Sequence, residues 1–401
     1  RAFLDFQQPS NAAPFGCTIM HNLLHRDYIN QSTPIGHWIA CANEPIHRRA
    51  ILPDALIQSL QNGAVFDQKS THVAYYYCDR RFIIAHHPPI HDKSTFMLVC
   101  RSSAKINLSL EVLSRRTDGY HLVRSVVHSI GLWDTLYFEF GIGPGFSLRS
   151  NWPALMAEDN LCLQAARAWT EAASAKTPQR FAGVRITLNK TIPLGGGLGG
   201  GSGNAAATLL ALNGQYQNLL EHEELERIAL QLGADVPFFL RGGCALMEGI
   251  GEQLTALPAQ KGWVVLICPP FHANTAKVFQ RYDDIHQTTK STSISDELTS
   301  ALKANKLKSI GNLLQNDLTM ASANQLFDPT HSIKVLLEHD AIGASMSGSG
   351  STIFGLYKGK KQAQDARSKI AEVLDEDFLV YAVPLTAESF ALLPPTSKVS
   401  K

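Results

Sequence analysis

The chain has 401 residues, 45% of them hydrophobic, so it can bury one large core or two ordinary ones, and its length favours two or three domains. Lysine plus arginine (36) almost balances aspartate plus glutamate (35), and the net charge of +1 gives no reason to expect a nucleic acid or an anionic membrane as partner. No apolar run is long enough for a membrane-spanning helix, and the seven cysteines are widely spaced without a C-x-x-C pair. We therefore expect a globular cytoplasmic protein with free thiols that binds a small molecule.

Residues 1–96 differ in character from the rest of the chain. They hold eight of the fifteen histidines and show no sustained hydrophobic period, so we predict no secondary structure there. The histidines within 86–91 are a weak candidate for a metal site, because prolines interrupt them and no acidic or cysteine partner stands at a recognisable interval. Seven acidic residues disfavour a transit peptide, and apolar patterning is too sparse for a small added domain. We expect the functional chain to begin near Met97, with residues 1–96 an unstructured extension or an upstream misread of the reading frame.

Regular patterns begin at Met97, and residues 97–258 are expected to form an N-terminal domain. Residues 106–112 alternate apolar and polar side chains, which predicts a half-buried strand. An Asp-Gly pair within 115–119 predicts a tight turn after it. The further elements expected here are a strand at 123–132, a helix at 160–173, a strand at 184–188, and helices at 204–213 and 223–232.

A second domain is predicted over 259–390, after a boundary near 255–262, with a tail at 391–401. Its expected elements are a buried strand at 264–268, helical stretches at 296–316 and 331–338, two strands flanking 347–351, a helix at 360–374 and a strand at 378–383. Mixed helices and strands in both parts predict an α+β protein.

A glycine-rich segment separates the strand at 184–188 from the helix that follows. Seven of the nine residues from Gly195 to Gly203 are glycine, which is costly unless the backbone must turn sharply and approach a ligand closely. Backbone N–H groups at a helix start bind anions, because the unpaired donors and the positive end of the helix dipole point the same way. The segment therefore predicts a phosphate-binding loop, where Ser202 adds a hydroxyl for phosphate or Mg²⁺. Its candidate residues are Pro193, Gly195, Gly196, Gly197, Leu198, Gly199, Gly200, Gly201, Ser202 and Asn204.

Three alternative interpretations of this loop are weaker. A flexible linker does not usually start a strongly helical segment. Gly195, Gly197 and Gly200 satisfy the dinucleotide-binding pattern G-x-G-x-x-G. However, the preceding strand alternates with polar residues, and the acidic Glu221 leads into a helix instead of ending a strand. A Walker A loop ends in Gly-Lys-Ser/Thr, and no lysine follows these glycines.

Three other segments carry candidate chemical groups. Asp235 lies on a bend, Gly-Ala-Asp-Val-Pro, where an isolated aspartate is more often a turn or cap residue. Lys105 and Asn107 lie on one face of the first strand and, by themselves, are compatible with a solvated strand start. A second loop of small residues, at 344–351, either closes over a ligand or forms a simple hairpin turn. Its candidate residues are Ser347, Gly348, Ser349 and Gly350.

The order of these segments resembles that of the motifs in the kinase superfamily named after galactokinase, homoserine kinase, mevalonate kinase and phosphomevalonate kinase. Within it, the chain is similar to the 4-diphosphocytidyl-2-C-methyl-D-erythritol kinases of the non-mevalonate isoprenoid pathway. The similarity lies in Ala104–Leu108 (AKINL), Arg116–His121 (R-x-DGYH) and Leu132–Leu136 (L-x-DTL), besides the glycine-rich and G-A-D-V-P segments. It extends over roughly residues 97–385.

The resemblance implies roles for the matching residues. Asp235 matches the catalytic aspartate, and Lys105 matches the lysine beside it. The positions that hold the cytosine ring and its neighbours are matched by Tyr120, His121, Phe279, Asn107 and Thr275. Core aromatic residues and a surface histidine are the alternative interpretation of these side chains. The chain departs from the family at Gly203, where a second serine is common, and we expect the phosphate loop to tolerate this.

The resemblance also implies a fold and a reaction. The expected fold is a two-domain α+β kinase with the glycine-rich loop in the N-terminal domain, a ferredoxin-like C-terminal domain, and the site between them. The expected donor is ATP with Mg²⁺, and no metal ligand is assigned in the protein. The expected acceptor is the 2-hydroxyl of 4-diphosphocytidyl-2-C-methyl-D-erythritol. The alternatives are a homoserine or mevalonate kinase, or a non-catalytic nucleotide-binding module.

Overall fold

The computed structural model describes residues 75–78, 81–84, 96–178, 180–285, 293–323 and 327–393. The chain divides into two compact units, Arg1–Ile90 and His91–Lys401. In the first unit, β1 (Tyr75–Cys78) pairs antiparallel with β2 (Arg81–Ile84). The sequence reveals neither strand, because four residues are too few to establish a period. The histidines at 86–91, and most of the predicted unstructured extension, lie outside the described residues.

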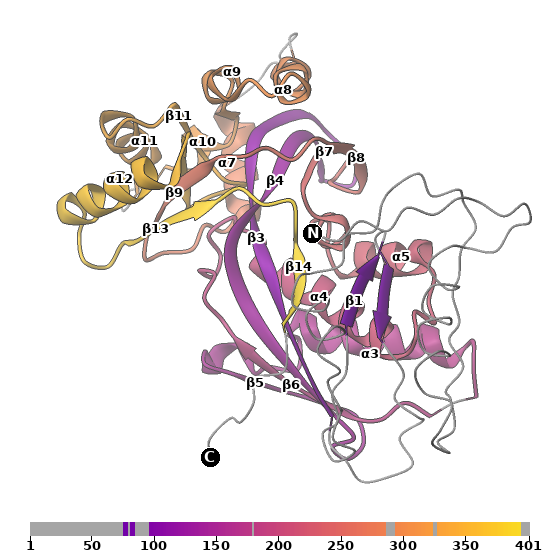
Figure 1. The fold of residues 1–401 in the computed structure, drawn as a ribbon. Coiled ribbons are helices and arrows are strands. Elements are labelled where there is room, and N and C mark those ends of the chain that lie inside the picture. Colours follow the sequence, from indigo (N-terminus) through magenta and orange to yellow (C-terminus); the bar gives the residue numbers. More distant parts are fainter. Residues whose placement is uncertain are drawn as a thin grey trace, which may run out of the picture. The chain divides into compact units, whose positions relative to one another are not determined.

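A mixed sheet of eight described strands forms the base of the second unit (Figure 1). Its strands are β3 (Phe96–Arg115), β4 (His121–Phe140), β5 (Phe146–Ser150), β6 (Val184–Asn189), β7 (Cys244–Glu248), β8 (Gln253–Leu257), β10 (Gln315–Asn316) and β14 (Phe390–Leu393). β3 and β4 pair along their whole lengths and are far longer than the strands predicted at 106–112 and 123–132. Three register shifts interrupt the pairing, so no single two-residue alternation runs through either strand.

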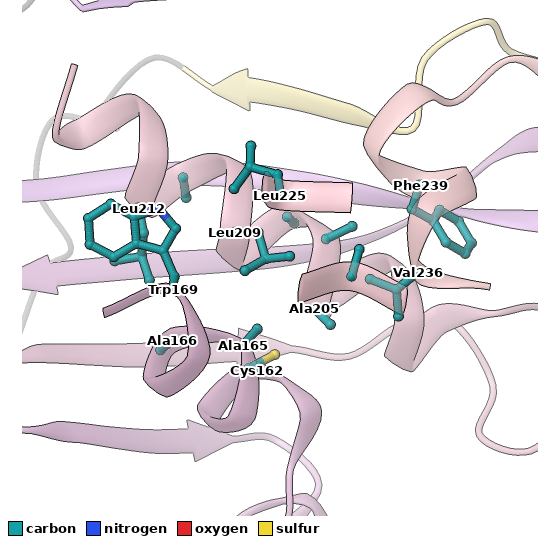
Figure 2. Close-up of a cluster of buried hydrophobic side chains, with 14 of the residues drawn as sticks. Cys162, Ala165, Ala166, Trp169, Ala205, Leu209, Leu212, Leu225, Val236 and Phe239 are labelled. Carbon is teal, nitrogen blue, oxygen red and sulfur yellow. The ribbon is translucent and has the colours of Figure 1, made fainter. Parts of the chain in front are cut away.

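Helices cover one face of this sheet (Figure 1). They are α3 (Leu161–Ser174), α4 (Gly200–Gln215), α5 (His222–Leu232) and α6 (Val236–Arg241), preceded by the short helix η1 (Pro153–Leu155). Asn160 caps α3 by accepting a hydrogen bond from the Cys162 N–H, and α5 begins with a capping box. Side chains from α3 to α6 gather in one apolar cluster around Trp169 (Figure 2). This packing fixes the helix that the glycine-rich loop precedes.

The C-terminal domain is built on an antiparallel sheet with the order β11-β12-β9-β13. Its strands are β9 (Trp263–Cys268), β11 (Gly343–Met346), β12 (Ile353–Tyr357) and β13 (Leu379–Pro384). Its helices are α7 (Thr275–Ile285), α8 (Ile294–Lys303), α9 (Leu307–Asn312), α10 (Thr319–Ser322), α11 (Pro329–Glu338) and α12 (Lys360–Val373). The sequence β9-α11-β11-β12-α12-β13 is the βαββαβ order of a ferredoxin-like fold, with α7 to α10 inserted after the first strand.

Two expectations for the C-terminal part need correction. The helical stretch at 296–316 is two helices and a short strand, because the chain turns at Asn305 with a positive φ of 53° and ends in β10. The predicted tail at 391–401 contains the end of β14, which pairs with β3. Since β10 also pairs with β3, the chain returns twice to the sheet of the N-terminal domain. Among the described residues, no helix is long and apolar enough to cross a membrane.

Candidate active site

The glycine-rich loop runs from β6 into α4 along a path that requires glycine. Gly195, Gly197 and Gly199 have φ values of 62°, 75° and 67°, in the left-handed region that favours glycine. A Cβ added at Gly197 would lie 2.0 Å from the Ser347 carbonyl oxygen. The last glycines form the first turn of α4, which therefore begins earlier than the predicted residue 204. The first-turn N–H groups of a buried helix thus face the loop, as an anion site needs.

A buried ion pair holds the chain segment that leads into the glycine-rich loop. Lys190 Nζ lies 2.7 Å from Asp134 Oδ2, and the side chains are only 3% and 0% exposed. Asp134 Oδ1 accepts hydrogen bonds from the N–H groups of Thr191 and Ile192, which lead into the loop. Burial lowers the pKa of Lys190, and the nearby Asp134 opposes this effect. Sequence reasoning misses Lys190, because a lysine at the end of a half-buried strand usually faces solvent.

A cavity of about 330 Å³ opens beside the loop. Ala154 and four leucine side chains give it apolar walls, and Asp159, Asn160, Lys190 and Asn204 add polar and charged groups. The cavity touches α4 at Gly201, in the first turn of the helix. Apolar walls with a few polar groups are typical of a small-molecule site.

Asp235 and Lys105 come together on the other side of the loop. Lys105 Nζ lies 3.5 Å from Asp235 Oδ2, and the lysine side chain is 5% exposed while the aspartate side chain is 33% exposed. The Lys105 N–H also donates to the Leu198 carbonyl oxygen at 2.9 Å, which joins β3 to the glycine-rich loop. Asp235 stands at the start of α6 and remains open to solvent on one side. The structure therefore brings the Asp235 carboxylate and the Lys105 ammonium group together beside the glycine-rich loop.

Asn107 links the lysine to the late loop of small residues. Its Oδ1 accepts from Lys105 Nζ at 2.6 Å, and its Nδ2 donates to Ser125 Oγ at 2.7 Å. The Ser347 hydroxyl donates to the Gly197 carbonyl oxygen at 2.9 Å and is fully buried. The Asn107 N–H donates to Ser347 Oγ at 3.4 Å, so Asn107 connects Lys105 with the late loop. The late loop therefore contacts the glycine-rich loop, a long-range contact that a simple hairpin turn would not need.

The residues expected around a base lie at the junction of β4 and α7. The His121 ring stacks on Phe279, with 4.8 Å between ring centroids and an interplanar angle of 23°. Thr275, at the start of α7, hydrogen-bonds through Oγ1 to Ser349 Oγ at 2.8 Å. Tyr120 is 64% exposed at the turn before β4, so its ring is accessible to a ligand.

Sequence reasoning misses Asp283, whose Oδ1 lies 2.7 Å from His121 Nε2. Asp283 stands one helical turn after Phe279, on the same face of α7. That spacing is the signal in the sequence that could have identified it. The residue is therefore placed beside the candidate base site by the helix that carries Phe279.

Two residues near the start of α4 pack closely against β3. Asn204 is buried and accepts a hydrogen bond from Ser102 Oγ at 2.5 Å, which ties α4 to β3. A Cβ at Gly203 would lie 3.0 Å from the Ser103 carbonyl oxygen, so a serine there would force a small shift. The glycine at this position therefore fits the close packing of α4 on β3.

Comparisons with known proteins identify the family of the chain. Residues 160–243 match the GHMP kinases N terminal domain, and residues 298–376 match the GHMP kinases C terminal family. The 4-diphosphocytidyl-2-C-methyl-D-erythritol kinase of Alkaliphilus metalliredigens is 35% identical over 282 residues, which cover 70% of this chain and 94% of that protein. The enzyme of the same name from a Janthinobacterium species is 38% identical over 265 residues, with coverages of 66% and 87%.

Solved structures give the same result. A crystal structure of 4-(cytidine 5'-diphospho)-2C-methyl-D-erythritol kinase is 31% identical, with a TM-score of 0.60 and coverage of 72% of this chain and 98% of that one. A homoserine kinase from Cytophaga hutchinsonii, at 20% identity and a TM-score of 0.59, shares the fold and covers 77% of this chain. These matches confirm the predicted family and the two-domain α+β kinase fold. The chain belongs to the 4-diphosphocytidyl-2-C-methyl-D-erythritol kinase family of the GHMP kinases.

Proposed function

We propose that this ATP-dependent kinase phosphorylates the 2-hydroxyl of 4-diphosphocytidyl-2-C-methyl-D-erythritol, in the synthesis of isoprenoid precursors. The observation that carries the proposal is the contact of Asp235 with Lys105, 3.5 Å apart beside the glycine-rich helix start, in a member of this family. Phosphoryl transfer to an alcohol needs positioning, neutralisation of phosphate charge and a proton acceptor near the attacking hydroxyl. The glycine-rich helix start, Lys105 and Asp235 are the groups that would meet these needs.

The donor side of the site is suited to ATP. The purine would occupy the cavity beside Asn160 and Gly201, and the phosphates would lie on the N–H groups at the start of α4. The Lys190–Asp134 pair would hold the loop in that shape. Among the described residues, no three histidine, cysteine or acidic side chains are grouped to hold a metal ion. Mg²⁺ would therefore arrive with the phosphates, whose charge it neutralises, with the Ser202 hydroxyl as a ligand from the protein.

The chemical step would depend on Asp235 and Lys105. The partly exposed Asp235 carboxylate accepts the proton of the attacking hydroxyl. The buried Lys105 ammonium orients that carboxylate and stabilises negative charge that develops on the transferred group. Asn107 keeps the ammonium group in place through its 2.6 Å hydrogen bond. Removing the carboxylate should therefore reduce turnover without removing the ATP site.

The acceptor side would recognise the cytosine ring. Tyr120 and Phe279 present aromatic faces that can stack on a base, and His121 offers a ring nitrogen to its edge. Thr275 and the late loop would face the rest of the substrate. Four cysteines, Cys100, Cys162, Cys244 and Cys268, are free and buried, which is consistent with a reducing compartment, and we place the enzyme in the cytoplasm.

The test of this function is ADP release with the full chain, Mg-ATP and three alcohols compared side by side. The cytidine-containing alcohol should give a kcat/KM at least about a hundredfold above homoserine and mevalonate, because only it engages the base site. Comparable use of homoserine or mevalonate would contradict the proposal. Omission of Mg²⁺, with a chelator present, should abolish turnover with the cytidine-containing alcohol.

A further inference from the structure

We propose that Asp283 is a positioning residue that fixes the tautomer of His121 and thereby selects a cytosine base over a uracil base. The inference rests on the proposed function, because it concerns how that site distinguishes its substrate. It assigns to α7 a role in specificity beyond the stacking of Phe279. Asp283 itself need not touch the substrate.

The contact between Asp283 and His121 is short and protected. Asp283 Oδ1 lies 2.7 Å from His121 Nε2, and the side chains are 28% and 8% exposed. Phe279, one turn earlier on α7, covers one face of the imidazole. The ring is therefore held between a carboxylate at its edge and an aromatic face, which leaves it little freedom to rotate. Ring orientation is thus set by α7.

The chemistry of the carboxylate decides which ring nitrogen carries the proton. An ionised carboxylate only accepts hydrogen bonds, so Nε2 must be the donor, and Nδ1 of the neutral ring is then an acceptor. Within the described residues Nδ1 makes no hydrogen bond, and it is not sealed from solvent. An acceptor at this position can receive a hydrogen bond from the exocyclic amino group of cytosine. Uracil has a carbonyl oxygen there, which would face Nδ1 as a second acceptor.

A purely structural role for Asp283 is the alternative. Asp283 Oδ2 also lies 3.3 Å from an Arg115 guanidinium nitrogen, but the arginine side chain is 61% exposed. Exposed ion pairs contribute little to stability, so this contact alone does not account for the placement of the carboxylate. The histidine contact is the protected one, and it lies beside the candidate base site. The two roles differ in what they predict for the choice of base.

The test compares Asp283→Asn and Asp283→Glu with Asp284→Asn, a matched change at the exposed neighbouring carboxylate. Asparagine can donate to Nε2 through its amide, which would place the proton on Nδ1 and reverse the polarity presented to the base. Steady-state kinetics would use the cytidine-containing alcohol and its uridine analogue. ¹⁵N NMR of the His121 ring would report the tautomer, and thermal unfolding would report stability.

We expect Asp283→Asn to lower the cytidine-to-uridine ratio of kcat/KM by roughly tenfold, the scale of one hydrogen bond, through the KM of the alcohol. The KM for ATP and the values for Asp284→Asn should stay at wild type, and Asp283→Glu should recover part of the ratio. A wild-type protein with the Nδ1–H tautomer would overturn the inference. So would an unchanged ratio in a folded Asp283→Asn protein. If the wild-type enzyme does not use the cytidine-containing alcohol at all, the proposed function fails instead.

Discussion

At the scale of single residues, His128 shows how burial fixes a protonation state. Its side chain is fully buried on β4, Nδ1 lies 2.8 Å from the Ser129 carbonyl oxygen, and Nε2 accepts from the Gln260 N–H at 2.9 Å. Since Nε2 accepts, the ring must be neutral. Burial lowers the pKa of His128 from 6.5 to about 4, while the contact with Ser129 opposes this effect.

This predicts a loss of stability in acid that depends on His128. The unfolded chain binds a proton near pH 6.5 and the folded chain only near pH 4, so the contribution is fully present above pH 6.5 and is lost as the pH falls towards 4. The loss should reach about 3 kcal/mol of unfolding free energy. Denaturant titrations between pH 7 and 4.5 would measure it, with His128→Gln as the reference. If the free energy of unfolding of the wild-type protein and of His128→Gln falls by the same amount over this pH range, the assignment to His128 is wrong.

The residues that could be predicted from sequence are those that belong to a motif with its own chemistry. Asp235 and Lys105 were predicted together, and the structure places them 3.5 Å apart. Lys190, Asp283 and His128 were not predicted, because each has its role only through a partner far away in the sequence. For Lys190 and His128, nothing in the neighbouring sequence distinguishes the residue from a solvated lysine or a core histidine. For Asp283, the four-residue spacing from Phe279 was the one local signal.

At the scale of elements, the glycine-rich loop and the late small-residue loop pack directly against each other. Gly197 has a φ of 75°, and a Cβ there would lie 2.0 Å from the Ser347 carbonyl oxygen. Gly197→Ala should therefore destabilise the protein by about 1 to 3 kcal/mol and raise the KM for ATP. Thermal unfolding and initial rates would measure this. Gly359→Ala is the matched control, because a Cβ there would meet nothing within 4 Å. If Gly197→Ala and Gly359→Ala had the same unfolding temperature and the same KM for ATP, the close contact between the two loops would not matter for stability or ATP binding.

Elements with strong local patterns were predicted, and those defined by distant pairing were not. The helix α3 and the strand β6 differ from the predicted ranges by at most one residue at either end. By contrast, β10 has only two residues and β14 is the unbroken apolar stretch Phe-Ala-Leu-Leu. Both exist because β3 offers them a partner, which a window of local sequence cannot show.

At the scale of the whole molecule, β3 connects the parts that make the site. It carries Lys105 and Asn107, pairs with β4 along its length, and receives β10 and β14 from the C-terminal part of the chain. The glycine-rich loop reaches it through Leu198, and the late loop reaches it through Ser347. The two domains were predicted from the pattern of expected elements and from the family resemblance, whereas this double return to β3 was not predicted. The site therefore depends on long-range pairing as much as on its motifs.

The most direct test of the central claim is the turnover of Asp235→Asn with the cytidine-containing alcohol and Mg-ATP, beside nucleotide binding measured by calorimetry. Asp340→Asn is the matched control, an exposed aspartate with a φ of 64° that asparagine also adopts. In Asp235→Asn, kcat should fall by roughly 10² to 10⁴, the range for a lost proton acceptor, while nucleotide affinity and the control stay near wild type. Near-wild-type turnover in a folded Asp235→Asn protein would contradict the claim that this carboxylate serves phosphoryl transfer.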